Sequence, residues 1–136
     1  MKKTASLFIL ALLFAFSSCQ IHTSSESNPV KPGMTKITIM YPNTEGSTFD
    51  MDYYATKHMP MLKELFGDKM KHLAIDKGLS GRLPEEPTPY LAIGYLYFDS
   101  LEEYNAAFGP NAEKILGDIP NYTNVSPTLQ ISEVVE

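Results

Sequence analysis

Hydrophobic and polar residues alternate in four short stretches of this 136-residue chain, and alternation with a period of two predicts β-strands. The four predicted strands are residues 35–41, 70–80, 90–98 and 128–135. The third, YLAIGYLYF, has the clearest pattern, and both of its faces carry apolar residues. One face holds Leu91, Ile93, Tyr95 and Tyr97, and the other holds Ala92, Gly94, Leu96 and Phe98.

Residues 49–66 follow a helical spacing instead, and Ser47 or Thr48 is suited to cap the helix that they predict. Pro60 interrupts this helix, because proline removes a backbone hydrogen bond and clashes with the carbonyl four residues earlier. It also disfavours helical geometry at Met59. We therefore expect a bend, unless Pro60 opens a short following helical turn, where proline is well tolerated.

A second helix is predicted for residues 99–108, which begin with a capping box of Ser100 and Glu103. Residues 111–116 predict one or two further turns, which Gly117 would close. The segment from Gly117 to the last strand is predicted to be a loop.

The predicted order is β-α-β followed by β-α-β, which indicates an α+β fold of the ferredoxin-like type. Such a fold has a four-stranded antiparallel sheet with both helices on one face. The other face of the sheet also carries apolar residues and stays uncovered. An uncovered apolar face is typical of a partner surface, so we expect a homodimer that packs sheet against sheet.

The sequence divides into three segments. Residues 1–19 begin with two lysines and continue with an apolar run that is too short to span a membrane. This pattern is typical of a secretory signal. The small residues before Cys19, the chain's only cysteine, resemble a bacterial lipobox, so we expect an exported, lipid-anchored envelope protein. Ordinary secretion with cleavage elsewhere is the alternative. Residues 20–33, rich in Ser and Pro, indicate a flexible linker, and residues 34–136 form the predicted domain.

The charge balance limits the possible partners. Removing residues 1–18 takes away two lysines and changes the formal net charge from −5 to −7. An acidic chain without clustered Lys or Arg argues against nucleic acid and against direct binding to anionic membrane surfaces. The sequence has no zinc-ligand pattern and no glycine-rich phosphate loop after a strand, so we expect neither a metal nor a cofactor.

Three motifs together resemble the EthD family: YPN at the end of the first strand, FDMDYYATKHMPML in the helix, and GDIPNYT before the last strand. The resemblance covers nearly the whole domain. It implies a dimeric α/β barrel with a pocket between sheet and helices in each subunit. Proteins with this architecture include lactone isomerases, polyketide cyclases, cofactor-free monooxygenases and haem-degrading enzymes, so the resemblance leaves the activity open.

His58 lies on the apolar stripe of the first helix and is predicted to face the sheet. Two interpretations stay open: a buried structural histidine, or a general acid/base at the rim of a pocket. Tyr41 is either a core aromatic residue or a hydrogen-bond donor beside His58. Tyr54 is a further candidate ligand contact, and the EthD-like loop adds Asp118 and Asn124.

These residues support three hypotheses. The first is a homodimeric protein with a pocket for a small hydrophobic carbonyl, lactone or aromatic compound, on which His58 and Tyr41 perform cofactor-independent acid/base chemistry. The second is an envelope protein that binds such a ligand without changing it. The third is a haem-contacting protein that uses His58 or His72, for which only the fold argues.

Overall fold

The computed structural model describes residues 28–136. The predicted signal segment, the predicted lipidation site Cys19 and the first part of the predicted linker lie outside the described residues. Within residues 28–136, no helix has both the length and the apolar character needed to cross a membrane.

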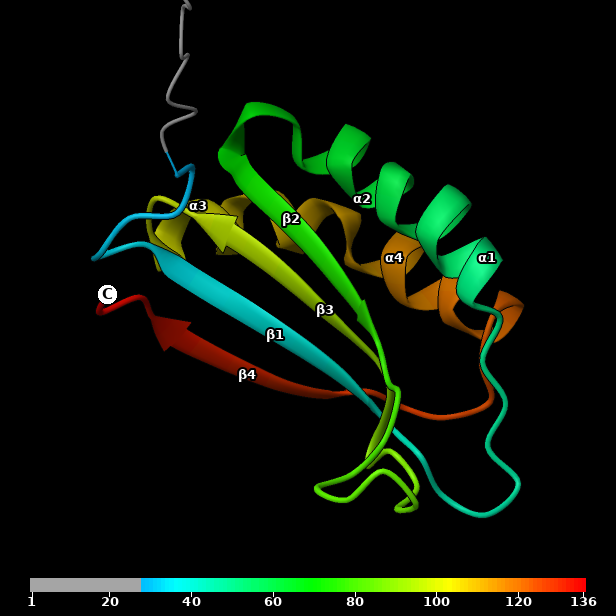
Figure 1. Ribbon diagram of the computed structural model, residues 1–136. Helices are drawn as coiled ribbons and strands as arrows, with labels where there is room; N and C mark the ends of the chain where they lie inside the picture. Colours follow the sequence, from blue (N-terminus) through cyan, green and yellow to red (C-terminus); the bar gives the residue numbers. More distant parts are fainter. Residues whose placement is uncertain (1–27) are drawn as a thin grey trace, which may run out of the picture.

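Four antiparallel strands form a single sheet in the order β2-β3-β1-β4 (Figure 1). Their bounds are Thr35–Pro42 for β1, Met70–Lys77 for β2, Tyr90–Phe98 for β3 and Thr128–Glu133 for β4. The two central strands are the first of each β-α-β unit, as the predicted ferredoxin-like α+β fold requires. That prediction is therefore confirmed.

The helices all cover one face of the sheet (Figure 1). The first helical segment is continuous and comprises α1 (Met51–Tyr53), a π-helical turn (Tyr54–His58) and α2 (Met59–Phe66). The second comprises α3 (Leu101–Phe108) and α4 (Ala112–Asp118), joined by a 3-10 turn (Gly109–Asn111). Further 3-10 turns follow α2 and α4, at Gly67–Lys69 and Ile119–Asn121.

The π-helical turn explains how the first helix contains Pro60. The N–H of Met59 donates to the carbonyl of Tyr54, five residues back, so the turn is wider than an α-helical one. A wider turn before the proline leaves room for its ring, which would otherwise meet the carbonyl four residues earlier. Met59 keeps helical dihedral angles (φ −67°, ψ −38°), so the predicted departure at this residue is wrong.

Two other predicted helix ends differ from the structure. The first helix is capped by Asp50, whose carboxylate accepts from the N–H of Tyr53 at 2.9 Å, and not by Ser47 or Thr48. The helix of the second unit does not end at Gly117, which lacks the positive φ of a terminating glycine. It continues to Asp118 and then into the 3-10 turn, which occupies part of the predicted loop.

The core lies between the helix layer and the sheet. On β3, the side chains of Ala92, Leu96 and Phe98 are buried beneath the helices together with Gly94. The opposite face of β3 is only half-buried, and none of the helices within residues 28–136 covers it (Figure 1). The two predicted faces of this strand are therefore confirmed.

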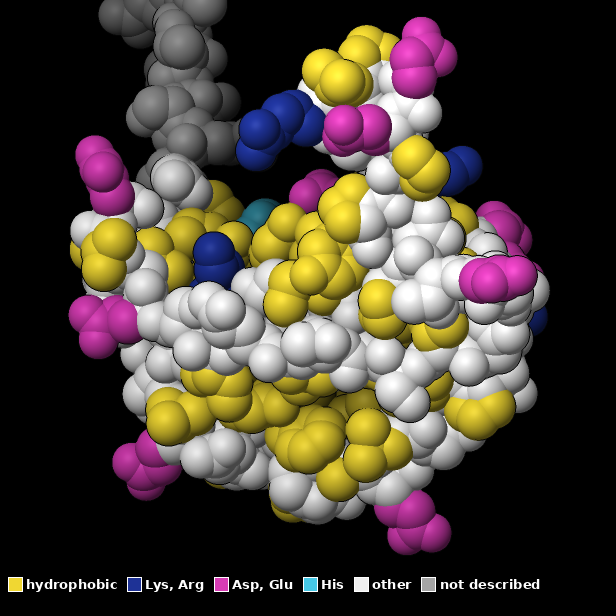
Figure 2. Space-filling view, turned by 90° about the horizontal axis from the view of Figure 1, so that it is seen from below, with side chains coloured by type: hydrophobic (Ala, Val, Ile, Leu, Met, Phe, Trp, Pro, Cys, Tyr) yellow, Lys and Arg dark blue, Asp and Glu magenta, His cyan; other side chains and the backbone are white. Residues whose placement is uncertain are grey.

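The helix layer does not extend over β4. Leu129 and Ile131 point to the same side of the sheet as buried Ile37 and its neighbour Ile39, yet they are 48% and 49% exposed. Leu116 of α4 is 54% exposed. Figure 2 shows hydrophobic side chains gathered on this side of the molecule. The space between helices and sheet therefore opens along the β4 edge.

Candidate functional site

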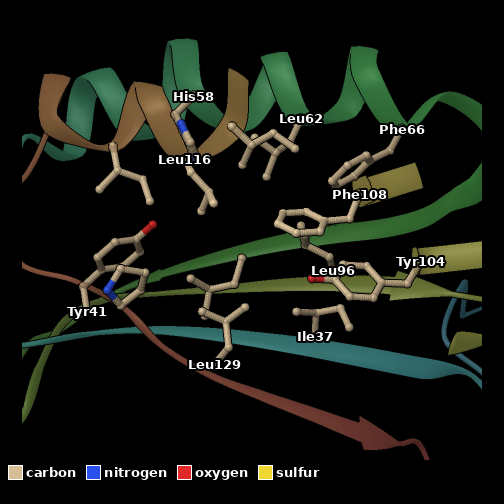
Figure 3. A pocket seen from close by; sticks show the side chains of 14 residues that line it. Ile37, Tyr41, His58, Leu62, Phe66, Leu96, Tyr104, Phe108, Leu116 and Leu129 are labelled. Carbon is tan, nitrogen blue, oxygen red and sulfur yellow. The ribbon is translucent and has the colours of Figure 1, made fainter. Parts of the chain in front are cut away.

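A cavity of about 60 Å³ lies between the helix layer and strands β1, β3 and β4 (Figure 3). A single water needs about 10–15 Å³ of such space, so the cavity has room for several water-sized groups. Among the described residues that line it, three have polar side chains: His58, Tyr41 and Tyr104. The remaining lining is apolar: Ile37, Ile39, Leu62, Phe66, Leu96, Phe108, Ile115, Leu116, Ile119, Pro127 and Leu129.

His58 is the last residue of the π-helical turn and reaches from the helix layer toward the sheet (Figure 3). It is 3% exposed. The inserted residue of a π-turn rotates everything after it by about 100° relative to a regular helix, because an α-helix has 3.6 residues per turn. The irregular turn, and not only the apolar stripe, thus decides which way the helix from His58 onward faces.

Asp118 holds one side of the His58 imidazole. Its Oδ2 lies 2.7 Å from His58 Nδ1. An ionised carboxylate can only accept a hydrogen bond, so the proton of a neutral imidazole lies on Nδ1. The other ring nitrogen, Nε2, then carries the lone pair that can accept a hydrogen bond or a proton. This is the arrangement that orients a histidine base.

Tyr122 contacts the other side of the ring. Its hydroxyl lies 3.3 Å from His58 Nε2 and 2.6 Å from the hydroxyl of Tyr41. With Nε2 as an acceptor, the Tyr122 hydroxyl donates to His58 and accepts from Tyr41. Tyr41 is 1% exposed and lines the cavity, and its hydroxyl points from β1 toward the helix layer (Figure 3). A directed chain of hydrogen bonds therefore joins the cavity wall to His58.

Two further side chains hold the Asp118 carboxylate in place. Its Oδ1 accepts from the hydroxyl of Tyr53 at 2.9 Å and from the side-chain amide of Asn121 at 2.8 Å. Partial burial alone would raise the pKa of the Asp118 carboxyl, but hydrogen bonds from His58, Asn121 and Tyr53 outweigh it and lower the pKa. Asp118 is therefore ionised at neutral pH.

Burial lowers the pKa of His58, and the neighbouring Asp118 offsets only part of this effect. The imidazole is therefore neutral at pH 7. Burial also raises the pKa of Tyr41 and of Tyr122 above the ordinary value for a phenol. Both hydroxyls therefore keep their protons at neutral pH. Either one can pass a proton on only if it receives another proton at the same time.

The predicted site residues differ in how they lie relative to His58 and to the cavity. Tyr41 lies near His58, as expected, but the bonds that join them run through Tyr122. Tyr54 stacks on the His58 ring with centroids 5.6 Å apart and is not among the residues that line the cavity.

Asp118 and Asn124 do not line this cavity but two separate hollows of the outer surface, so their ligand contacts stay predictions. Asp118 lies behind His58. Asn124 accepts from the N–H of Thr48 at 2.8 Å and donates to the carbonyl of Gly46 at 2.9 Å. These two bonds join the loop of Asn124 to the loop 43–48. The backbone of both loops lacks the regular partners of a helix or strand, so a side-chain amide can supply them.

Sequence reasoning missed Tyr122. It also missed Tyr53 and Asn121, which bind Asp118 at the outer end of the hydrogen-bond chain. Tyr122 follows a 3-10 turn that the sequence does not indicate, and its partners are 64 and 81 residues away. The signal that could have found it is its place inside the EthD-like motif GDIPNYT. Among the described residues, no cluster of three or more His, Cys, Asp and Glu could hold a metal ion.

Comparison with known proteins identifies the family. The EthD domain matches residues 42–126. The chain is 43% identical to a structurally characterised EthD-like protein of Ralstonia eutropha JMP134, with a TM-score of 0.74, covering 78% of this chain and 96% of that one.

Two further proteins are more distant. An EthD family protein of Bacillus halodurans C-125 is 18% identical with a TM-score of 0.52, covering 75% of this chain and 99% of that one, which shows the fold alone. An uncharacterized 11.0 kDa protein of the Rhodococcus erythropolis thcB-thcC intergenic region is 28% identical over 102 residues, 74% of this chain and 94% of its own length. With a family match over residues 42–126 and a 43% identical relative of the same fold, this chain belongs to the EthD domain family.

Proposed function

We propose that the cavity binds a small hydrophobic carbonyl, lactone or aromatic compound and that His58 acts on it as a general base without a cofactor. The observation that supports this proposal is the 2.7 Å contact of Asp118 with His58 Nδ1 at the wall of a largely apolar cavity. A neutral imidazole with an oriented Nε2 is the form that accepts a proton at neutral pH.

The surroundings of His58 suit such a transfer. The apolar lining keeps the low dielectric in which a hydrogen bond to a developing oxyanion is strong. The Tyr41 hydroxyl donates to Tyr122 at rest, and it can donate to the oxygen of the ligand once a proton has passed along the chain to His58. The imidazolium that forms on His58 is stabilised by the Asp118 carboxylate. The ligand therefore needs an acidic proton, one polar oxygen and an otherwise apolar body.

Proton exchange with solvent tests this proposal. Enolisable cyclic ketones and unsaturated lactones are incubated with the protein in D₂O, and NMR follows loss of the proton next to the carbonyl and any isomerised product. Removing a general base typically costs about 10²–10⁴-fold in rate, so His58→Gln should reduce exchange by that factor. His72→Gln is the matched control, because His72 lies against Tyr97 on the helix-free face of the sheet. Equal exchange in His58→Gln and the wild type would overturn the proposal.

Binding without reaction is the second candidate function. Its support is that His58 Nε2 already has a partner, Tyr122, and that most of the cavity lining is apolar. In this case the same compounds bind, with chemical-shift changes at cavity residues, and are recovered without deuterium.

Two properties outside the cavity belong to the same proposal. The half-buried, helix-free sheet face supports a homodimer that packs sheet against sheet. The small residues before Cys19 support lipidation of this residue and attachment to the cell envelope. The mass of the mature N-terminal peptide from cells tests the second point, since an unmodified Cys19 would contradict it.

A further inference from the structure

The hydrogen-bond chain that begins at Tyr41 does not end at His58. It continues through the imidazole to Asp118, on the other side of the helix layer. The Asp118 side chain is 16% exposed and lines a groove of the outer surface with Asn121 and Lys114. A single path of hydrogen bonds thus connects the buried cavity to a separate groove on the outer surface.

We propose that this path is a proton relay in which Tyr122 carries the proton between Tyr41 and His58, while Asp118 orients the imidazole and opens it to solvent. This inference deepens the proposed function and rests on it. It assigns a role to Tyr122, which is not among the residues that line the cavity.

The transfer balances without any further reactant. The acidic proton of the ligand moves to the Tyr41 oxygen as the Tyr41 proton moves to the Tyr122 oxygen and the Tyr122 proton moves to His58 Nε2. The two tyrosines are unchanged, the ligand becomes an anion and His58 becomes a cation beside the Asp118 carboxylate. The renewed Tyr41 hydroxyl then faces the ligand and donates to its anionic oxygen.

Tyr122 is held firmly enough for this role. It is 3% exposed, and its ring packs against those of His58 and Tyr54 at centroid distances of 4.6 and 5.2 Å. Its carbonyl accepts from the N–H of Asp50 at 2.7 Å. This bond joins the segment of Tyr122 to the start of the helix that carries His58, so the two groups keep their relative position.

The relay is reset when the protons return along the same path, from His58 Nε2 to Tyr122, from Tyr122 to Tyr41 and from Tyr41 to the ligand anion. Because the Asp118 carboxylate reaches the surface, the Nδ1 proton can exchange with bulk water at the outer end of the path. Tyr53 and Asn121 hold the carboxylate in the orientation that His58 needs.

NMR of the imidazole nitrogens tests the path without any ligand. The wild type should show His58 as the Nδ1–H tautomer with Nε2 as an acceptor. In Asp118→Asn the amide can donate to Nδ1, so the tautomer should change to Nε2–H. Tyr122→Phe keeps the ring but removes the donor, so the Nε2 resonance should shift while the tautomer stays. Tyr97→Phe, on the helix-free face, is the matched control and should change neither.

The D₂O exchange reaction supplies the second readout. Tyr122→Phe should lower the exchange rate by about tenfold or more, with the dissociation constant of the compound within about twofold of the wild-type value. An unchanged rate would overturn the relay, since His58 would then act on the ligand directly. An Nε2–H tautomer in the wild type would also overturn it. A wild type with the expected tautomer but no exchange contradicts the proposed function itself, and with it the transfer step.

Discussion

His58 shows how a buried ionisable residue is accommodated in a small domain. Removing an imidazole from water disfavours its charged form, and a buried polar nitrogen without a partner costs free energy. Here both nitrogens have partners, Asp118 and Tyr122. The neutral ring is therefore fully hydrogen-bonded, while the charged ring would have one carboxylate to stabilise it. The residue is stable in one state and can reach the other, which is what a proton acceptor needs.

The lowered pKa of His58 predicts how stability depends on pH. The groups that face the ring are the Asp118 carboxylate, the Tyr122 hydroxyl and the Tyr54 ring. Below about pH 6.5, the ordinary value for histidine, the unfolded chain binds a proton that the folded chain does not yet bind. The free energy of unfolding should therefore fall as the pH decreases through 6.5 toward the folded pKa.

Urea unfolding between pH 7.5 and 5 measures this dependence. His58→Gln should reduce the slope, because it removes the group with the lowered pKa. The Asp118 carboxyl should not contribute in this window, because its pKa lies below the ordinary value and its stabilisation is lost only as the pH falls below about 3.8. A slope that His58→Gln leaves unchanged would show that another group causes it.

At the scale of elements, the π-helical turn and strand β3 depend on each other. Gly94 lies beneath the turn, and a Cβ at this position would meet the hydroxyl of Tyr54 and the methyl group of Met59. Both are fully buried core residues. The glycine thus makes room for the wide turn, which in turn orients the helix at His58 over the cavity.

Gly94→Ala should destabilise the protein by about 1–3 kcal/mol, the usual cost of inserting a group into a packed core. Urea unfolding gives this value, and the His58 resonances report whether the turn has moved. Gly109→Ala is the matched control, because a Cβ there meets nothing within 4 Å and φ is helical. It should be neutral or slightly stabilising. Equal stability of Gly94→Ala and the wild type would contradict the packing argument.

At the scale of the whole molecule, the helices cover one face of the sheet and leave the other half-buried (Figure 1). That second face mixes apolar and polar side chains, including Ile93 and Tyr95 of β3 and Lys36 of β1. The amino group of Lys36 lies 5.9 Å from the centroid of the Tyr95 ring. A face of this composition is suited to a partner that is bound by both packing and polar contacts.

Sedimentation equilibrium tests the proposed homodimer. The chain from residue 28 should be dimeric, and Ile93→Glu should make it monomeric, because a carboxylate would be buried without a partner in the interface. Leu101→Glu is the control: Leu101 is 47% exposed on α3, on the helix layer, and the dimer should persist. A monomeric wild type across micromolar concentrations would contradict the proposal.

Local sequence determined the strands, the two helical segments and the apolar face on which His58 lies. These features depend on period and composition within about ten residues, and the ferredoxin-like order followed from them. The family also followed from motifs in the sequence. The exceptions were local as well: the carboxylate of Asp50, two residues after Thr48, caps the first helix, and Gly117 continues the helix of the second unit instead of ending it.

Only the tertiary structure decided the site. Asp118 and Tyr122 meet His58 across 60 and 64 residues of chain, and Tyr41 meets Tyr122 across 81, through bonds that depend on the packing of helices on the sheet. The periodic pattern of apolar residues does not predict such contacts. The partners of a side chain depend on where whole helices and strands lie, and not on its neighbours in sequence. The π-turn adds a rotation that a regular helical pattern does not contain. The sequence thus determined which residue types were present, and the fold determined which of them are hydrogen-bonded to one another.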